Sequence, residues 1–385
     1  MRLLTFFLLL AFATRSFAQG LPELGDASAA VLSAQQEQQL GDRIMREVRN
    51  DPSYLDDPEL TQYINNLGYQ LVSASPDARQ GFHFFLIDDA SINAFAFPGG
   101  YIGINTGVLL AAQSESELAS VLAHEISHVT QHHLARMLAG QKQTFLTSLA
   151  ALAVAILASR SNPQVSQAAI ATAQASALQS QLSFTREHER EADRIGLSVL
   201  EEAGFDPRAM AVFFDRLQKS HRLLETSAPA YLQTHPLTYE RIADVQNRVQ
   251  NLPYRPAANS LDFHLMRAKV RANQGSARDA IVFFQDSLTD RKYSNEAAAR
   301  YGLVTALMRD KQYERARKEL AILQKSVPSN PVIAHLGGRL AGAQGKTGEA
   351  MEIYRAALER YPQHRAIGYD YADVLISNGK PEEAL

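Results

Sequence analysis

The chain has 385 residues, with 38 Lys and Arg against 41 Asp and Glu, and it contains no cysteine. A hydrophobic fraction of 46% is enough for a globular chain of two or three domains. The slightly acidic balance argues against a nucleic-acid partner, and without cysteine the stability must come from core packing and any bound metal.

The N-terminus has the pattern of an export signal. Arg2 precedes an apolar run over residues 3–13, and a small-x-small cleavage pattern ends at Ala18. The run is too short for a stable membrane span. A lipid anchor would need a cysteine at the cut, and there is none. We therefore expect a signal peptide over residues 1–18 and a periplasmic mature protein.

A short sheet is predicted next. Helical patterns begin near Ser33 and at Asp57-Pro58, and they are followed by the β-type run GFHFFLID. The turn Pro98-Gly99-Gly100 separates two further apolar runs, which predicts a β-hairpin. A helix should then start after Thr106.

The sequence HEISH at residues 124–128 lies inside a helical pattern of apolar residues. Residues four apart share one helix face, so His124 and His128 can bind one metal while Glu125 stands beside it. This arrangement fits a metal that polarises water and a carboxylate that takes the proton, as in zinc peptidases. The alternative is a polar helix face with two solvated histidines.

A catalytic zinc needs a third protein ligand. Gln131 and Leu134 stand where a metzincin would have Gly and His, so that class is excluded. His132 continues the helix face but lies about 12 Å of helix rise from His124. We interpret His132 and His133 as surface residues.

Three carboxylates in the downstream run TREHEREAD compete for the third position. Glu189 precedes Asp193 by four residues, so one of these carboxylates can bind zinc while the other accepts a hydrogen bond from a ligand histidine. Glu187 and Glu191 share another face, which could be a solvated stripe with Arg190 and Arg194. Spacing favours Glu189 and leaves the other two open.

Residues 145–158 are almost uncharged. A membrane span needs roughly twenty residues, so we expect a buried helix or an interfacial hairpin, with at most peripheral membrane contact.

From Asn259 onward the sequence is repetitive, with Ala280, Ala316, Ala350 and Ala384 separated by 36, 34 and 34 residues. A period of 34 predicts tetratricopeptide repeats rather than a generic helical bundle.

Together, HEISH, the Glu-x-x-Ala-Asp core of TREHEREAD and the run NAFAFPGGYIGINTGVL resemble the zinc endopeptidase family of the HtpX heat-shock protease and the CAAX prenyl protease. With the signal segment and the repeats, the chain resembles the periplasmic protease-chaperones of that family. The resemblance implies that Glu189, which opens Glu-x-x-Ala-Asp, is the third ligand. Unlike HtpX, this chain has only the signal segment as a hydrophobic span, which argues against prenylated substrates.

His235 has two interpretations. A lone His-Pro in the run YLQTHPLTYERIADV is usually a structural loop residue. The resemblance instead implies that His235 lies near the zinc, where it would occupy the fourth position and keep the enzyme latent.

We thus expect a mainly α (α+β) protein: a signal peptide over 1–18, a zinc metalloprotease domain with a small sheet over 19–258, and an all-α tetratricopeptide-repeat solenoid over 259–385. The last repeat is incomplete at Leu385, so we expect the natural protein to continue. Repeat arrays need a solubilising cap.

The expected function is a periplasmic endopeptidase with one Zn²⁺ per chain. His124, His128 and Glu189 hold the metal, and Glu125 transfers protons. The strand around Asn93, Ala94 and Phe95 is expected to receive substrate by strand addition.

The resemblance implies unfolded or misassembled outer-membrane proteins as clients. It also implies that the repeats contact the barrel-assembly machinery, and that the protein acts as a chaperone as well as a protease. The alternative function is a repeat-based chaperone or adaptor of that machinery, in which proteolysis is minor.

Overall fold

The computed structural model describes residues 33–76, 80–138, 186–223, 230–252 and 257–384. The predicted signal peptide over 1–18 and the apolar run 145–158 lie outside these ranges. Within them, every helix is too short or too polar to cross a membrane.

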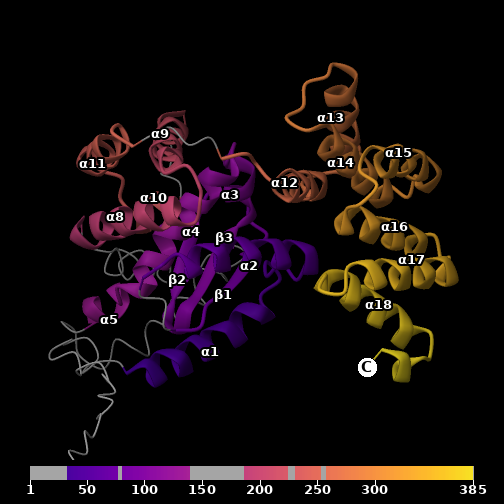
Figure 1. Ribbon diagram of the computed structural model, residues 1–385, viewed down its shortest axis with the longest axis horizontal. Helices are drawn as coiled ribbons and strands as arrows, with labels where there is room; N and C mark the ends of the chain where they lie inside the picture. The colour runs from indigo at the N-terminus through magenta and orange to yellow at the C-terminus, as the bar shows by residue number, and fades with distance from the viewer. Residues whose placement is uncertain (1–32, 77–79, 139–185, 224–229, 253–256, 385) are drawn as a thin grey trace, which may run out of the picture.

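The N-terminal part combines a small sheet with helices on both of its sides (Figure 1). Ser33 and Asp57 cap the first two helices, where the sequence predicted them to begin. The helices of this part are α1 (Ala34–Asn50), α2 (Pro58–Ser73), α3 (Thr106–Ala111), α4 (Glu115–Thr130), α5 (His133–Leu138), α8 (Arg186–Glu202), α9 (Arg208–Leu223), α10 (Ala230–Thr234) and α11 (Tyr239–Val249).

The sheet has three strands: β1 (His83–Ile87), β2 (Ala94–Phe97) and β3 (Tyr101–Asn105). Their order is β1-β3-β2, with β3 parallel to β1 and antiparallel to β2. The predicted hairpin is therefore confirmed, and β2 forms one edge of the sheet. Gly99 and Gly100 in its turn have φ angles of 76° and 77°, a conformation that favours glycine.

The alternating side chains of the strands divide the core. One face of β1 packs under α1, where Phe85 and Ile87 meet Ile44 and Val48. The opposite face joins the larger core that includes α2 and α4. The strand residues of this larger core are Phe84, Leu86, Ala94, Ile102 and Ile104.

Helix α4 lies in the middle of this part, against α2, α8, α9 and β2. Ser114 caps its first turn, because the Ser114 hydroxyl accepts a hydrogen bond from the backbone N–H of Glu117. All but one of its sixteen residues are buried. The HEISH sequence therefore sits on a helix held on several sides.

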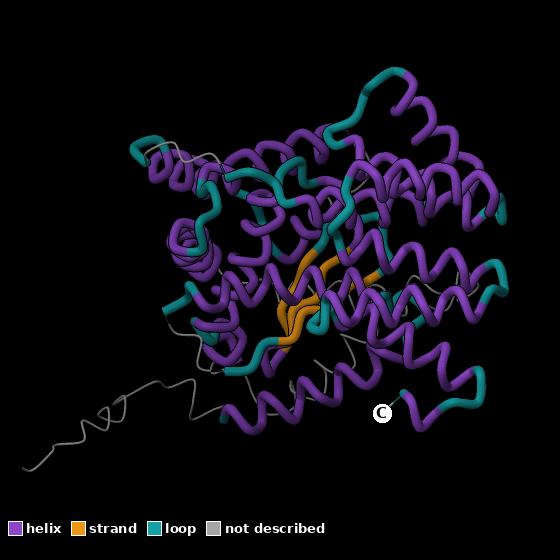
Figure 2. Tube along the Cα trace, turned by 45° about the vertical axis from the view of Figure 1, so that its right-hand side comes forward, coloured by secondary structure: helices purple, strands orange, loops and turns teal. Residues whose placement is uncertain are grey.

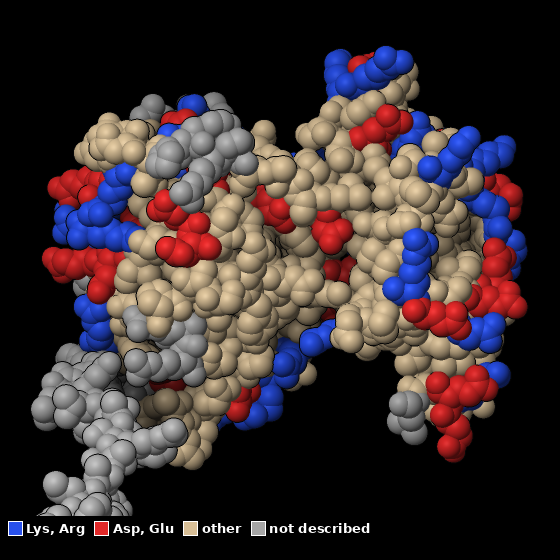
Figure 3. All heavy atoms as spheres, viewed as in Figure 1, with Lys and Arg blue, Asp and Glu red and all other residues tan. Residues whose placement is uncertain are grey.

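The C-terminal part is an array of paired helices, which confirms the predicted all-α repeat architecture (Figure 2). Ala280, Ala316 and Ala350 are buried, so the period of the sequence reflects small residues at helix contacts. On the face shown in Figure 3, positive and negative side chains are interspersed over this array. Its helices are α12 (Leu261–Asn273), α13 (Ala277–Thr289), α14 (Glu296–Arg309), α15 (Tyr313–Ser326), α16 (Pro331–Ala343), α17 (Thr347–Arg360) and α18 (Arg365–Ser377).

The array curves back onto the N-terminal part, so that both α12 and α18 contact α2. At the start of α2, the carboxylate of Glu59 accepts hydrogen bonds from Lys269 of α12, Tyr301 of α14 and His335 of α16. The helix that carries this carboxylate also packs against the metal-motif helix α4. The repeats are thus packed against the scaffold of the candidate site.

Candidate metal centre

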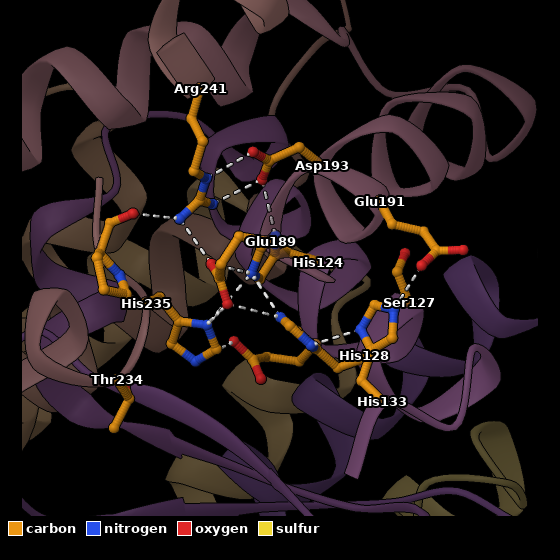
Figure 4. Close-up of polar contacts among 12 residues, drawn as sticks. His124, Ser127, His128, His133, Glu189, Glu191, Asp193, Thr234, His235 and Arg241 are labelled. Atoms are coloured by element: carbon orange, nitrogen blue, oxygen red, sulfur yellow. Dashed lines mark hydrogen bonds and ion pairs between the residues drawn. The ribbon is translucent and has the colours of Figure 1, made fainter. Parts of the chain in front are cut away.

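His124 and His128 lie one turn apart on α4, and both are buried. Their rings are turned so that the two Nε2 atoms are 2.9 Å apart, as Figure 4 shows. The other ring nitrogen of each histidine faces away from this point, toward Asp193 for His124 and toward His133 for His128. Both Nε2 lone pairs can therefore serve one ion.

Helix α8 brings Glu189 to the two histidines. Its Oε2 lies 3.5 Å from Nε2 of His124, and its Oε1 lies 3.4 Å from Nε2 of His128. Glu187 is exposed on the same helix, and the Glu191 carboxylate lies beside His133 and Arg136 instead. Of the three competing carboxylates, the structure brings only Glu189 to the pair of histidines.

Asp193 lies one turn further along α8, with Oδ1 2.9 Å from Nδ1 of His124. The guanidinium of Arg241 donates to both oxygens of Asp193 at 2.7 Å, and its Nη1 is 2.6 Å from Oε2 of Glu189. Asp193 thus orients one histidine while Arg241 fixes both carboxylates.

Arg241 is a site residue that the sequence reasoning missed. It is only 1% exposed, although arginine is seldom fully buried. The available signal was its position in α11, where Arg241 shares a helix face with Val245 and Val249. A charged residue on an apolar face indicates a buried partner.

Glu125 is fully buried beside the cluster, and neither of its carboxylate oxygens has a hydrogen-bond partner among the described residues. Its Oε1 is 3.5 Å from Nε2 of His235. Burial raises the pKa of the Glu125 carboxyl, although the neighbouring His235 and His124 oppose the shift. A carboxylate with an elevated pKa and free oxygens is suited to accept and return a proton.

His235 follows α10 and points into the same cluster. Its Nδ1 is 3.0 Å from Oε1 of Glu189 and 3.4 Å from Nε2 of His124. The ring of Tyr231 stacks on it, with centroids 4.7 Å apart, and the Tyr231 N–H donates to the carbonyl of Ile92 just before β2. The structure therefore brings His235 to the three predicted ligands and holds it there through α10.

Burial and the neighbouring charges together set the pKa values of the cluster. Burial alone would raise the pKa of Glu189, but the neighbouring His235 and Arg241 hold it well below its usual range. Burial alone would lower the pKa of His124, but the hydrogen bonds that its ring donates to the carboxylates of Asp193 and Glu189 raise it to about 9. Burial holds the pKa of His128 well below its usual range.

The arrangement fits a metal ion. One ligand atom from each of His124, His128, Glu189 and His235 lies within 4.8 Å of all the others, and all four residues are buried. Two imidazoles and a carboxylate are the donor set of many catalytic zinc sites. The Nε2 atoms of His124 and His128 face each other, and the Glu125 oxygens beside them have no hydrogen-bond partner among the described residues. A cation bound between these groups would explain both observations.

The predicted substrate strand lies at the sheet edge near this cluster. Asn93 and Ala94 are buried, and Phe95 is half-buried in β2. The Asn93 carbonyl accepts from the N–H of Asn105, which extends the pairing with β3 by one residue. Helix α4 packs against β2, so the edge and the metal-motif helix are neighbours.

The prediction that His133 is a surface residue is wrong, whereas His132 remains partly exposed. His132 is half-buried, and His133 is fully buried, with its ring nitrogens facing His128 and Glu191. The prediction assumed a continuous helix, but α4 ends at Thr130 and His132 has a φ of 50°. The chain turns there and brings the next histidine back to the cluster.

Residues 56–249 match Peptidase family M48, and residues 265–331 and 343–385 match tetratricopeptide repeats. The beta-barrel assembly-enhancing protease of Escherichia coli strain K12 is 37% identical over 369 residues, which cover 95% of this chain and 75% of that protein. This chain belongs to peptidase family M48. Its members include metalloendopeptidases, and this chain is one of them.

Two more relatives show how far the M48 similarity extends. The beta-barrel assembly-enhancing protease of Yersinia pestis is 34% identical over 366 residues, covering 95% of this chain and 75% of that protein. The mitochondrial metalloendopeptidase OMA1 of Schizosaccharomyces pombe is 29% identical over 207 residues, covering 54% of this chain and 55% of that protein. The M48 match covers the segment from α2 to α11, and this segment contains every residue of the cluster.

Proposed function

We propose that this protein is a periplasmic zinc endopeptidase and chaperone that degrades misfolded or stalled outer-membrane proteins and assists their assembly. The observation that carries the proposal is the buried cluster of His124, His128 and Glu189 with Glu125 beside it. The client class rests on the name of the E. coli and Y. pestis relatives. The compartment rests on the predicted signal peptide.

In the proposed mechanism, His124, His128 and Glu189 hold one zinc ion. Zinc bound there would polarise the scissile carbonyl and make water acidic enough to attack it. Glu125 takes the proton of the attacking water and then hands it to the leaving amine. Asp193 accepts a hydrogen bond from Nδ1 of His124 and keeps this histidine in the tautomer whose Nε2 would be available to the metal.

The edge strand β2 is the proposed site of substrate binding. The Asn93–Asn105 hydrogen bond and the antiparallel register place the N–H and C=O groups of Ala94 and Ala96 on the side away from β3. A client in extended conformation can pair with this edge through its backbone. Such pairing suits an enzyme that accepts many sequences.

His235 is proposed to regulate the site. As a fourth ligand it would fill the position that the attacking water needs, and α10 ties it to the start of β2 through the Tyr231–Ile92 hydrogen bond. A client that pairs with β2 would disturb this anchor. Binding of a client at β2 would then displace His235 from the fourth ligand position.

The repeats are proposed to contact the barrel-assembly machinery. The first helices of three pairs, α12, α14 and α16, contact Glu59. The second helices, such as α13 and α15, are therefore the surface proposed for a partner. Val282 and Phe283 of α13 and Ile322 of α15 are exposed there. Contact with a membrane is proposed to be peripheral at most, and no nucleic-acid partner is proposed.

The test compares one outer-membrane barrel protein in two states. Purified wild-type protein is incubated with the urea-unfolded barrel protein and, separately, with the same protein folded in detergent. We expect the unfolded form to be cut and the folded barrel to survive. Suppressed aggregation without any cleavage would instead support the chaperone or adaptor function and contradict the proposed protease.

A further inference from the structure

His133 connects the candidate metal centre to the protein surface. Its Nδ1 is 2.9 Å from Nδ1 of His128, and its Nε2 is 3.1 Å from Oε2 of Glu191. The same Glu191 oxygen accepts from Nη1 of Arg136 at 2.8 Å. The ring is 0% exposed and stacks on His188, with centroids 4.5 Å apart (Figure 4 shows the contacts of His133 with His128 and Glu191).

These contacts determine where the protons lie. A neutral imidazole has one N–H donor and one acceptor nitrogen. The contact between the two Nδ1 atoms at 2.9 Å requires that one of them carry no proton, and the full burial of the His133 ring favours its neutral form. Because Nε2 faces the Glu191 carboxylate, which only accepts, Nε2 carries the proton and Nδ1 of His133 is an acceptor.

The acceptor on His133 then determines the tautomer of His128. The Nδ1 of His128 must donate to it, which leaves Nε2 of His128 without a proton. That Nε2 is the atom facing His124 and Glu189. A zinc ligand must present such an unprotonated nitrogen.

The two histidines of HEISH thus have parallel supports. The Nδ1 of His124 is directly at a carboxylate, Asp193, which Arg241 holds. The Nδ1 of His128 reaches a carboxylate through one additional ring, His133, and Arg136 holds that carboxylate.

The break after α4 makes this contact possible. On a continuous helix, residues five apart are turned by about 140° from one another and cannot share a face. The helix ends at Thr130, and His132 takes a left-handed conformation with φ 50°. Such a conformation is uncommon for residues other than glycine, and here it returns His133 to the ring of His128.

We propose that His133 is a positioning residue of the metal centre: its Nδ1 accepts the His128 N–H and thereby holds His128 as an unprotonated Nε2 ligand. The proposal rests on the proposed zinc site, and it assigns to His133 no contact with substrate or metal. Its specific consequence is that the hydrogen-bond acceptor, and not the bulk of the ring, is needed at this position.

Two substitutions separate the two contacts. In His133→Asn, the amide oxygen is bonded to the same carbon as Nδ1 of histidine and can still accept from His128. In His133→Gln, the amide group reaches the position of Nε2 and keeps only the contact with Glu191. His83→Asn, at the exposed first residue of β1, is the matched control.

The measurement is the zinc dissociation constant of each full-length variant, obtained by competition with a chromophoric chelator. Urea unfolding of the metal-free proteins is the reference for folding. We expect wild type, His83→Asn and His133→Asn to agree within about three-fold, and His133→Gln to bind roughly ten- to a hundred-fold more weakly. The visible spectrum of the Co²⁺-substituted His133→Gln protein should also differ from that of wild type.

Equal zinc affinity of folded His133→Asn and His133→Gln proteins would overturn the proposal. If either variant fails to fold without metal, Glu191→Gln replaces the comparison. It should weaken zinc binding several-fold by removing the charged acceptor of His133, and unchanged affinity would again overturn the proposal. Wild-type protein that binds zinc but cleaves no client would refute the proposed protease function and leave the His133 result standing on affinity alone.

Discussion

Lys269 of α12 and Glu59 of α2 form a buried ion pair between the repeat array and the N-terminal part, with Nζ 2.6 Å from Oε2. Tyr301 and His335 donate to the same carboxylate, and His335 continues to Asp370 at 2.8 Å. One carboxylate therefore contacts the first helices of three successive helix pairs. The face of the array formed by α12, α14 and α16 thus binds an acidic residue of the N-terminal part of the same chain.

Glu59→Gln should destabilise the protein. The amide keeps the shape of the side chain but leaves Lys269 with Asp57 as its remaining partner, at 2.7 Å. Removing one partner from a buried pair costs on the order of 3 kcal/mol. Urea unfolding of the metal-free protein measures this loss, and Glu296→Gln in the exposed pair with Arg300 is the control that should leave the unfolding midpoint unchanged.

The effect of Glu59→Gln should depend on pH. Burial alone would raise the pKa of Glu59, but Lys269 and His335 hold it far below the value of an unfolded chain. The stabilisation by Glu59 is therefore complete above about pH 4.3, the unfolded value, and is lost as the pH falls below it. The difference in unfolding free energy between wild type and Glu59→Gln should shrink from pH 6 toward pH 3, and a constant or growing difference would contradict the ion-pair account.

Much of the fold could be predicted because its signals are local. Apolar periodicity, the caps at Ser33 and Asp57, and the Pro98-Gly99-Gly100 turn act over a few residues, and the repeat period reflects alanines at repeated helix contacts. The parallel pairing of β1 with β3 and the contact of Glu59 with the repeats were not predicted. They join segments far apart in the chain, and no local pattern specifies which partners meet.

The residues of the candidate site also fall into those that local spacing predicts and those that depend on tertiary packing. Helical spacing alone predicted that His124 and His128 share a face. It favoured Glu189 but could not exclude Glu191, because both stand on one helix. His133 was misplaced because the left-handed conformation of His132 interrupts the helix on which the prediction was based. Arg241 reaches the cluster from α11, so its role depends on tertiary packing.

Glu189→Gln should lower the zinc content of the purified protein. The amide loses the negative charge that stands between the two histidines, so one of the three proposed ligands is weakened. Glu187→Gln, on the exposed side of the same helix, is the matched control and should retain one zinc per chain. Metal analysis that found Glu189→Gln fully loaded and Glu187→Gln depleted would contradict the proposed ligand set.

His235→Ala should increase basal proteolysis, including self-cleavage. Removing the imidazole opens the fourth position, while the three remaining ligands keep the metal bound. Casein cleavage at equal zinc occupancy measures the change, with His264→Ala in α12 as a histidine control away from the cluster. A drop in activity of roughly ten-fold or more would mean that His235 stabilises the transition state, and the gate proposal would then be wrong.

Ala96→Pro should weaken substrate binding without weakening the sheet. The Ala96 N–H points away from β3, so proline removes a donor from the outer side of β2, which has no partner strand among the described residues, and leaves the β2–β3 ladder intact. We expect KM for an unfolded client to rise several-fold with little change in kcat, whereas Ala96→Ser, which keeps the N–H, should resemble wild type. An unchanged KM in Ala96→Pro would argue against strand addition at β2.

The central claim, that Glu125 is the proton-transferring base of a zinc peptidase, is tested most directly by casein cleavage with Glu125→Gln protein at a measured zinc content. The amide cannot accept a proton, and Glu125 is not among the proposed ligands. We therefore expect one zinc per chain and a loss of cleavage of roughly a hundred-fold or more relative to wild type. Near-normal cleavage by the zinc-loaded variant would contradict the account.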